Sequence, residues 1–267
     1  MLRLTTLLLV FLAIVVGSEV SAHELSIYTK SLDELEQIIA TDVLAGQMPR
    51  QSDMRAGELL SAVTDAKRFL ENERYSQEEL GALAIACNRT IEIYKKYLLF
   101  GVQDPDSALR VPRLSSKDVR DTAKRNVSNF QPELTRLEIF NLQCAAKQTS
   151  LVGEVATKVD QTQATHDAFR PGIQQMRVGC FAVYLGALVK ATEDVFPISI
   201  SYKLQLAAVL SDKASTFSEI FTPDLREVIV RRLTTQVASI SNDELRMHIA
   251  RIIQVMSDPQ CKGLCKY

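Results

Sequence analysis

The chain has 267 residues, 46% of them hydrophobic and 24% charged, with a formal net charge of −1. This composition is ordinary for a globular protein, and the balanced charge excludes a bulk attraction to nucleic acid or an anionic membrane. Only 10 Gly and 8 Pro disfavour an all-β fold with many tight turns, and the absence of Trp makes aromatic platforms for sugars or bases scarce.

The first 22 residues predict a secretory signal peptide. A charged start at Arg3 leads into an apolar run over residues 7–16, and small residues precede a cut near Ala22. The run is shorter than the roughly 20 apolar residues of a membrane span. No Cys follows the predicted cut, so we expect neither a lipid nor a membrane anchor after cleavage. The mature chain would be one helical domain over 23–267, located in the periplasm or secreted.

Apolar residues at a spacing near 3.6 predict helices along the rest of the chain. In chain order they are expected at about 31–45, 53–73, 76–98, 116–130, 132–160, 172–194, 199–220, 222–240 and 241–256. The predicted fold is therefore a single all-α domain of eight to nine helices, built from antiparallel helical hairpins.

Four sequence signals mark helix starts. Capping boxes, in which Ser and Glu side chains satisfy free backbone N–H groups, are predicted at Ser31–Glu34, Ser76–Glu79 and Ser241–Glu244. Thr222 followed by Pro223 predicts an N-cap with proline in the first helical position.

Turn residues predict the breaks between helices. The 101–115 segment is the main irregular loop, and Arg170–Gly172, which includes Pro171, is expected to interrupt a helix. Pro132 is expected to start a helix or to kink a longer one. The strand-like run Val195–Tyr202 has no partner strand and is interpreted as a helix junction.

A weak repeat at a shift of 20 residues pairs Leu225-Arg226 and Arg231 with Leu245-Arg246 and Arg251. Helix amphipathicity alone is an alternative explanation. Interleaved acids favour a solvated, salt-bridged face over an anion-binding surface for the arginines of this region, which are Arg226, Arg231, Arg232, Arg246 and Arg251.

Five cysteines leave at least one thiol unpaired within the chain. Cys261 and Cys265 are candidates for a local disulfide that clamps the tail, with half of a zinc site as the alternative. Cys144 and Cys180 lie at almost equal distances from a polar stretch at 160–165 and are candidates for a bridge across a helical hairpin. The alternative is that each is a small buried apolar residue. Cys87 lies on an apolar face and is expected in the core.

Histidine chemistry has one specific candidate. Cleavage after Ala22 would place His23 at the mature N-terminus, where its amine and imidazole together suit a copper ion. This is similar to the histidine brace of copper monooxygenases, although those proteins are β-sandwiches with a second His. A cut near Ser18 would remove the possibility. His166 and His248 are interpreted as ordinary histidines.

No serine-hydrolase elbow, zinc-hydrolase helix or phosphate-binding loop occurs in the sequence. The paired acids at Glu193-Asp194 are interpreted as a solvated helix end. No catalytic residue or cofactor is predicted. We therefore expect a non-enzymatic exported protein that binds another macromolecule, with another protein as partner. The alternatives are an exported enzyme whose site is assembled from scattered residues, and a carrier with an apolar cavity between helices.

Overall fold

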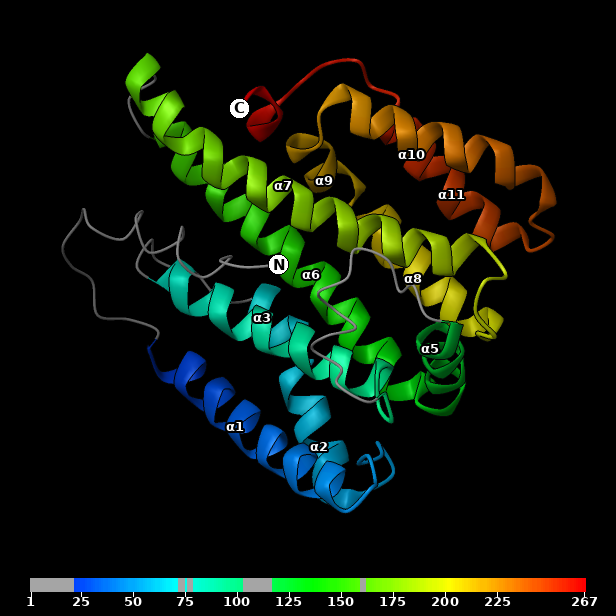
Figure 1. The fold of residues 1–267 in the computed structure, drawn as a ribbon. Helices are drawn as coiled ribbons and strands as arrows, with labels where there is room; N and C mark the ends of the chain where they lie inside the picture. The colour runs from blue at the N-terminus through cyan, green and yellow to red at the C-terminus, as the bar shows by residue number, and fades with distance from the viewer. Residues whose placement is uncertain (1–21, 72–74, 76–78, 103–116, 159–161) are drawn as a thin grey trace. The chain divides into compact units, whose positions relative to one another are not determined.

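The computed structural model describes residues 22–71, 75, 79–102, 117–158 and 162–267, and every regular element in them is helical (Figure 1). The predicted all-α class is confirmed. The helices are α1 (Ala22–Leu44), α2 (Met54–Val63), α3 (Glu79–Leu98), α5 (Lys117–Asn129), α6 (Gln131–Lys158), α7 (Gln163–Thr192), α8 (Ile200–Asp212), α9 (Ala214–Ile220), α10 (Pro223–Gln236) and α11 (Asp243–Met256). Single helical turns are η2 (Lys67–Glu71), η3 (Val237–Ser239) and η4 (Gly263–Lys266).

The described residues thus form ten α-helices rather than eight to nine. The additional helix arises because the segment expected over 199–220 divides into α8 and α9. The helix expected over 53–73 also ends early, after α2, and is followed by the single turn η2. The Thr64 hydroxyl donates to the Leu60 carbonyl at 2.6 Å, and the Asp65 carboxylate accepts from the Arg68 N–H at 3.1 Å. These local side-chain bonds end one helix and cap the next turn.

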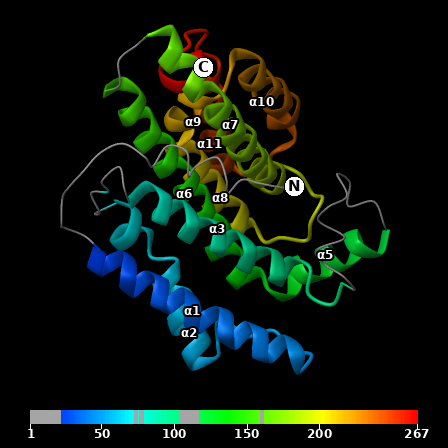
Figure 2. The same ribbon diagram turned by 60° about the vertical axis from the view of Figure 1, so that its left-hand side comes forward.

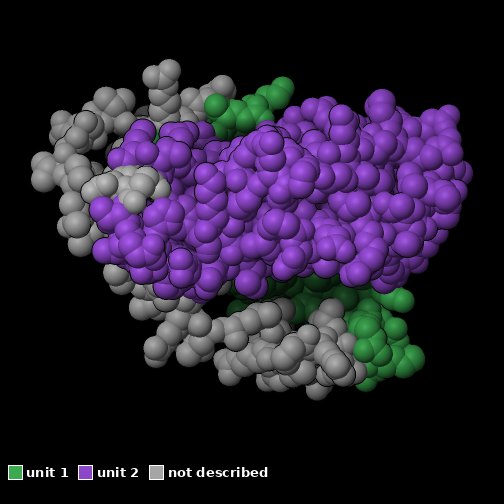
Figure 3. Space-filling model, turned by 90° about the horizontal axis from the view of Figure 1, so that it is seen from above, with its two compact units in different colours: residues 1–3, 14–141, 196–198 green, residues 4–13, 142–195, 199–267 purple. Residues whose placement is uncertain are grey.

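The contacts group the chain into two compact units (Figure 3). Unit 1 contains the described residues of 22–141 together with 196–198, and unit 2 contains the described residues of 142–195 and 199–267. None of the described helices combines the length and the apolar character needed to cross a membrane.

Several predicted boundaries are confirmed. α6 begins at Gln131 with Pro132 in its first turn, and Thr222 is the N-cap of α10 with proline in the first position. Residues 193–199 join α7 to α8 without a strand, as the lack of a partner strand predicted. The predicted cap at Ser76 and most of the predicted loop, from residue 103 onward, lie outside the described residues.

Three predicted boundaries are wrong. The N-cap of α11 is Asn242, whose side chain accepts from the Leu245 N–H at 2.9 Å, and not Ser241. Ser31 lies inside α1, where its hydroxyl donates to the Ile27 carbonyl at 3.2 Å instead of capping a helix. α7 runs through the exposed Pro171, although an interior proline costs roughly 3 kcal/mol. Buried residues such as Ile173 and Tyr184 continue the apolar stripe beyond it, so packing outweighs the local penalty.

The core of unit 1 forms around α1, which contacts α2 and α3 (Figure 1, Figure 2). The Tyr28 and Phe69 rings stack at 3.8 Å, and the buried Tyr28 hydroxyl donates to the Val63 carbonyl at 3.0 Å. At the other end of the core, the buried Asn126 amide of α5 donates to the carbonyls of Leu98 and Phe100 at 3.0 and 2.8 Å. This amide satisfies the end of α3 and ties it to α5.

In unit 2, α11 contacts α8, α9 and α10, and α7 contacts α8 (Figure 1, Figure 2). Its aromatic core joins the fully buried Tyr184 to Phe217 and Phe221, with ring centroids 4.8 and 5.7 Å away. The Tyr184 hydroxyl donates to the Leu210 carbonyl at 3.2 Å, so the polar tip of this buried ring is satisfied.

Two buried arginines hold the C-terminal tail of unit 2. Arg177 of α7 donates from Nε to the Ile220 carbonyl at 2.7 Å and from Nη2 to the Leu264 carbonyl at 3.0 Å. Arg226 of α10 is 2% exposed and donates from Nη1 to the carbonyls of Asp258 and Gln260. Long-range hydrogen bonds therefore fix a segment that has little regular structure of its own.

Candidate functional site

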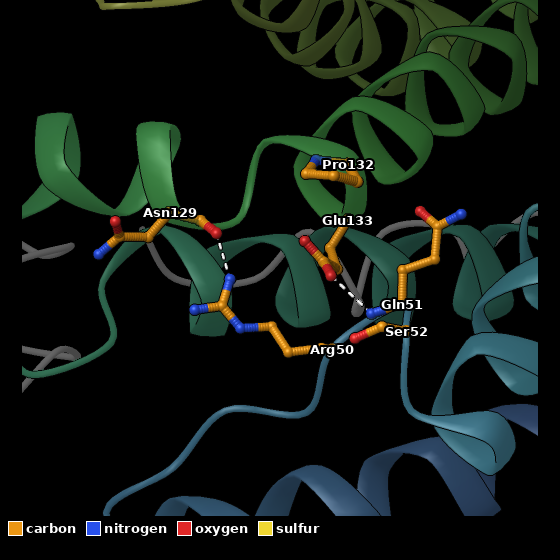
Figure 4. A pocket seen from close by; sticks show the side chains of 6 residues that line it. All are labelled: Arg50, Gln51, Ser52, Asn129, Pro132 and Glu133. Carbon is orange, nitrogen blue, oxygen red and sulfur yellow. Dashed lines mark hydrogen bonds between the residues drawn. The ribbon is translucent and has the colours of Figure 1, made fainter.

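A surface cleft of about 560 Å³ opens in unit 1 (Figure 4). One wall is the connection between α1 and α2, and the other is the junction where α5 ends and α6 begins. The lining residues are Arg50, Gln51, Ser52, Asn129, Pro132 and Glu133. The cleft is shallow and open to solvent.

The α5–α6 junction turns at a single residue, Phe130. Its N–H donates to the Asn126 carbonyl at 2.8 Å, and its carbonyl accepts from the Leu134 N–H at 2.9 Å, so hydrogen bonding continues through the turn. Pro132 fits the first turn of α6 because N–H groups there have no partner within the helix. Glu133 follows in the same turn, where a negative charge is stabilised by the helix dipole.

The opposite wall is held in place by Tyr97 and Gly57. The buried Tyr97 hydroxyl donates to the Pro49 carbonyl at 2.9 Å, and its ring packs edge-on against Phe130. A Cβ added to Gly57 would lie 2.2 Å from the Gln51 carbonyl oxygen. Glycine is therefore required where α2 passes under the loop, and any side chain there would displace that wall of the cleft.

Glu133 is the unusual side chain of the cleft. It is 2% exposed, and its Oε1 accepts a 2.6 Å hydrogen bond from the Gln51 N–H. Its Oε2 is buried and has no hydrogen-bond partner. In Figure 4 this second oxygen points away from Gln51, toward the side of the cleft formed by Arg50 and Asn129. A buried carboxylate oxygen without a donor is energetically unfavourable by more than the 1–3 kcal/mol typical of a neutral group.

The Arg50 guanidinium does not neutralise this oxygen. Its Nη1 donates to the Asn129 backbone carbonyl, and its centre lies 4.2 Å from the centroid of the Phe130 ring. The charge is thus directed to a carbonyl and an aromatic face. The cleft consequently presents a half-exposed cation and a buried anion that do not pair with each other.

Charge in this region also affects Tyr97. Burial raises the pKa of the Tyr97 hydroxyl well above its usual value, and the nearby carboxylates of Glu133 and Asp53 raise it further. The hydroxyl therefore stays protonated and remains a donor to Pro49.

The sequence pointed to other residues as site candidates, and the structure describes several of them. Cys261 and Cys265 form a disulfide with Cα atoms 5.7 Å apart. Cys87 and Cys144 are both disulfide-bonded, and both are buried. Cys180 is a free, buried thiol.

The candidate bridge between Cys144 and Cys180 is therefore wrong, and the reason is helix register. The Thr149 hydroxyl of α6 lies 3.7 Å from the Cys180 sulfur of α7, so Cys180 is level with Thr149. Thr149 lies five positions after Cys144, which corresponds to about 7.5 Å along a helix axis at 1.5 Å per residue. Equal sequence distance from the turn did not predict this offset. Burial raises the pKa of the Cys180 thiol to about 11.

None of the residues that line the cleft is a histidine. His166 stacks on Tyr267 with ring centroids 4.4 Å apart. The side chain of His23 lies outside the described residues, so copper binding there stays a prediction. Within the described residues, no group of three or more His, Cys, Asp or Glu side chains is placed to hold a metal ion.

His248 of α11 contacts a serine that sequence reasoning missed. Its Nδ1 lies 2.9 Å from the Ser211 Oγ of α8, and this hydroxyl also donates to the Ala208 carbonyl at 3.1 Å. A serine nucleophile needs the histidine to accept its proton. The single Ser211 hydroxyl proton has two possible acceptors, the Ala208 carbonyl and His248 Nδ1, and Ser211 is 3% exposed, so its oxygen is not open to a substrate. The geometry is that of an interhelical tie rather than an activated nucleophile.

The interpretation of the arginine-rich region as a solvated face is wrong for Arg226, which is buried against the tail. Its counterpart in the weak repeat, Arg246, is exposed and pairs with Asp243. Glu193 is not a free helix end either. Its Oε1 accepts from Arg232 Nε at 2.6 Å and from Gln236 Nε2 at 2.7 Å, which joins α7 to α10.

No family model matches the chain, and no curated protein or solved structure is significantly similar to it. The cleft therefore has to be interpreted from its own chemistry. Sequence reasoning missed it because Glu133 beside Pro132 has the pattern of an ordinary acidic first turn. Only the approach of the 50–52 segment buries the carboxylate.

Proposed function

We propose that this chain is an exported, non-enzymatic protein that works by binding a segment of another protein in the cleft of unit 1. The observation that supports this most directly is the buried Glu133 oxygen without a partner, in a cleft open at the surface. A hydrogen-bond donor supplied by a bound partner would satisfy it.

Two further observations support binding rather than catalysis. In the cleft, Arg50 donates to the Asn129 carbonyl and only Oε1 of Glu133 is bonded, to the Gln51 N–H, so the two charged groups do not form an acid–base pair. In the Ser211–His248 contact the serine is 3% exposed, which suits a tie between α8 and α11.

Export rests on the N-terminal sequence and agrees with the cysteines. Four of the five cysteines are disulfide-bonded, which suits an oxidising compartment. N-terminal sequencing of the exported protein tests the cut: a first residue of His23 supports it. Copper titration of that form, with His23→Ala as the control, then tests the copper hypothesis, and an unchanged affinity in the variant would end it.

Site-directed photo-crosslinking in the producing cells tests the binding function. A photoreactive residue at Ser52, which is exposed in the cleft wall, is compared with one at the exposed Ala82 of α3. We expect a discrete adduct with another polypeptide at position 52 that is missing at position 82. No adduct at either position, or the same adducts at both, would overturn the proposal.

A further inference from the structure

We infer that the Glu133 carboxylate receives a primary ammonium group, and that the segment bound in the cleft presents a lysine side chain there. The inference rests on the proposed function and specifies its chemistry. It starts from the free Oε2 atom of a side chain that is 2% exposed and lines the cleft.

None of the donors that line the cleft bonds to Glu133 Oε2. The Gln51 N–H binds the other oxygen, Oε1, at 2.6 Å. Arg50 donates to the Asn129 carbonyl and lies over Phe130, and the Tyr97 hydroxyl donates to Pro49. The fold therefore leaves one acceptor position on a buried anion without a donor from its own lining.

The number of free oxygens selects the cation. An arginine guanidinium binds a carboxylate best through two parallel hydrogen bonds, which needs both oxygens. Glu133 offers one, because Oε1 is already occupied. A compact ammonium group is a point charge that a single oxygen accepts well. The exposed Pro132 ring beside Glu133 supplies an apolar surface for the aliphatic part of a lysine side chain.

The charge of Arg50 adds a constraint on the neighbouring groups of the ligand. Its guanidinium lines the same cleft and is half-buried. A second positive charge on the bound segment would be repelled there, so an isolated lysine is favoured over a run of basic residues.

The test uses the full chain and three short peptides with blocked ends, Ac-Gly-Lys-Gly-NH₂ and its arginine and norleucine counterparts. Binding is followed by amide chemical shifts in ¹H–¹⁵N spectra. We expect the lysine peptide to shift the Gln51 amide, and the norleucine peptide to bind at least tenfold more weakly. The arginine peptide should also bind more weakly than the lysine peptide.

Glu133→Gln removes the charge but keeps an acceptor for the Gln51 N–H. We expect it to weaken binding of the lysine peptide by tenfold or more. Glu138→Gln, which neutralises another buried acid of α6, is the matched control and should leave binding unchanged. If Glu133→Gln does not fold, the comparison of lysine with norleucine on the unaltered chain decides the question.

The outcomes separate this inference from the proposed function. Equal binding of lysine and norleucine peptides, no shift at Gln51, or equal loss in both variants would overturn the ammonium site. A specific crosslink at Ser52 together with any of these results would keep the binding function and reject lysine recognition. The absence of that crosslink would reject the binding function itself.

Discussion

Replacement of Arg177 by methionine is expected to destabilise unit 2 and to release its C-terminal tail. The side chain is 8% exposed and makes two hydrogen bonds, to the Ile220 carbonyl at 2.7 Å and to the Leu264 carbonyl at 3.0 Å. Methionine approximates the volume of the stem, so the cavity term stays small. What is lost is the pair of donors.

The magnitude follows from these two bonds. Hydrogen bonds from a charged donor contribute about 1.5–3 kcal/mol each, and a buried carbonyl left without a donor costs about 1–3 kcal/mol. Part of this loss is offset because the variant no longer buries a charge, and burial already lowers the pKa of Arg177. We expect a net loss of about 2–4 kcal/mol, a large part of the 5–15 kcal/mol typical of a domain.

Urea unfolding measures the free energy of unfolding. The rate of tryptic cleavage after Lys262, followed by mass spectrometry, reports how firmly the C-terminal tail is held. Arg170→Met is the matched control on the same helix, because Arg170 is exposed and its contact with Asp167 is 3.5 Å long. The control should change stability by less than about 0.5 kcal/mol. If Arg177→Met stays within that margin and its tail is cleaved as slowly as that of the unaltered chain, the assigned role of Arg177 is wrong.

Three other predictions test separate parts of the structure. The Cys180 thiol, with its pKa near 11, should not react with a disulfide reagent at neutral pH in the folded chain, whereas one thiol per chain should react in denaturant without reductant. Asn242→Ala should destabilise α11 by about 1 kcal/mol in urea unfolding, and Ser241→Ala, at the cap the sequence predicted, should not. The Gln260 backbone N–H holds the pKa of the Asp258 carboxyl below its usual 3.8. The ionised carboxyl therefore stabilises the folded tail fully above pH 3.8, and this stabilisation is lost as the pH falls through the lower folded-state pKa. Hydrogen exchange of the tail should show this acid-side loss, and Asp258→Asn should abolish the step.

The sequence predicted helices well where the signal was local. Pro132 and Thr222-Pro223 set helix starts by a missing N–H and a fixed φ, and neighbouring residues do not alter those effects. Sequence reasoning was less accurate where a local signal competed with packing. Pro171 should break a helix, yet α7 is continuous through it, and the buried residues of α7 begin at Ile173, just after the proline.

The candidate site could not be predicted to the same degree. Glu133 and Arg50 are far apart in sequence, and each has an ordinary local explanation as a first-turn acid and a loop cation. Their significance comes from burial of one carboxylate oxygen by the Gln51 backbone and from the engagement of Arg50 with Asn129. Neither contact leaves a periodic pattern or a characteristic residue spacing in the sequence.

The cysteines show most clearly which properties follow from the sequence and which depend on the tertiary structure. The sequence favoured the Cys261–Cys265 bridge because the two cysteines are only four positions apart with a glycine between them, and the structure shows this bridge. The sequence by itself determined that at least one thiol is left over. Only the tertiary structure decided that this thiol is Cys180, since the register of α7 against α6 places it beside Thr149. Register depends on the packing of whole helix faces, which no count of residues from a turn can supply.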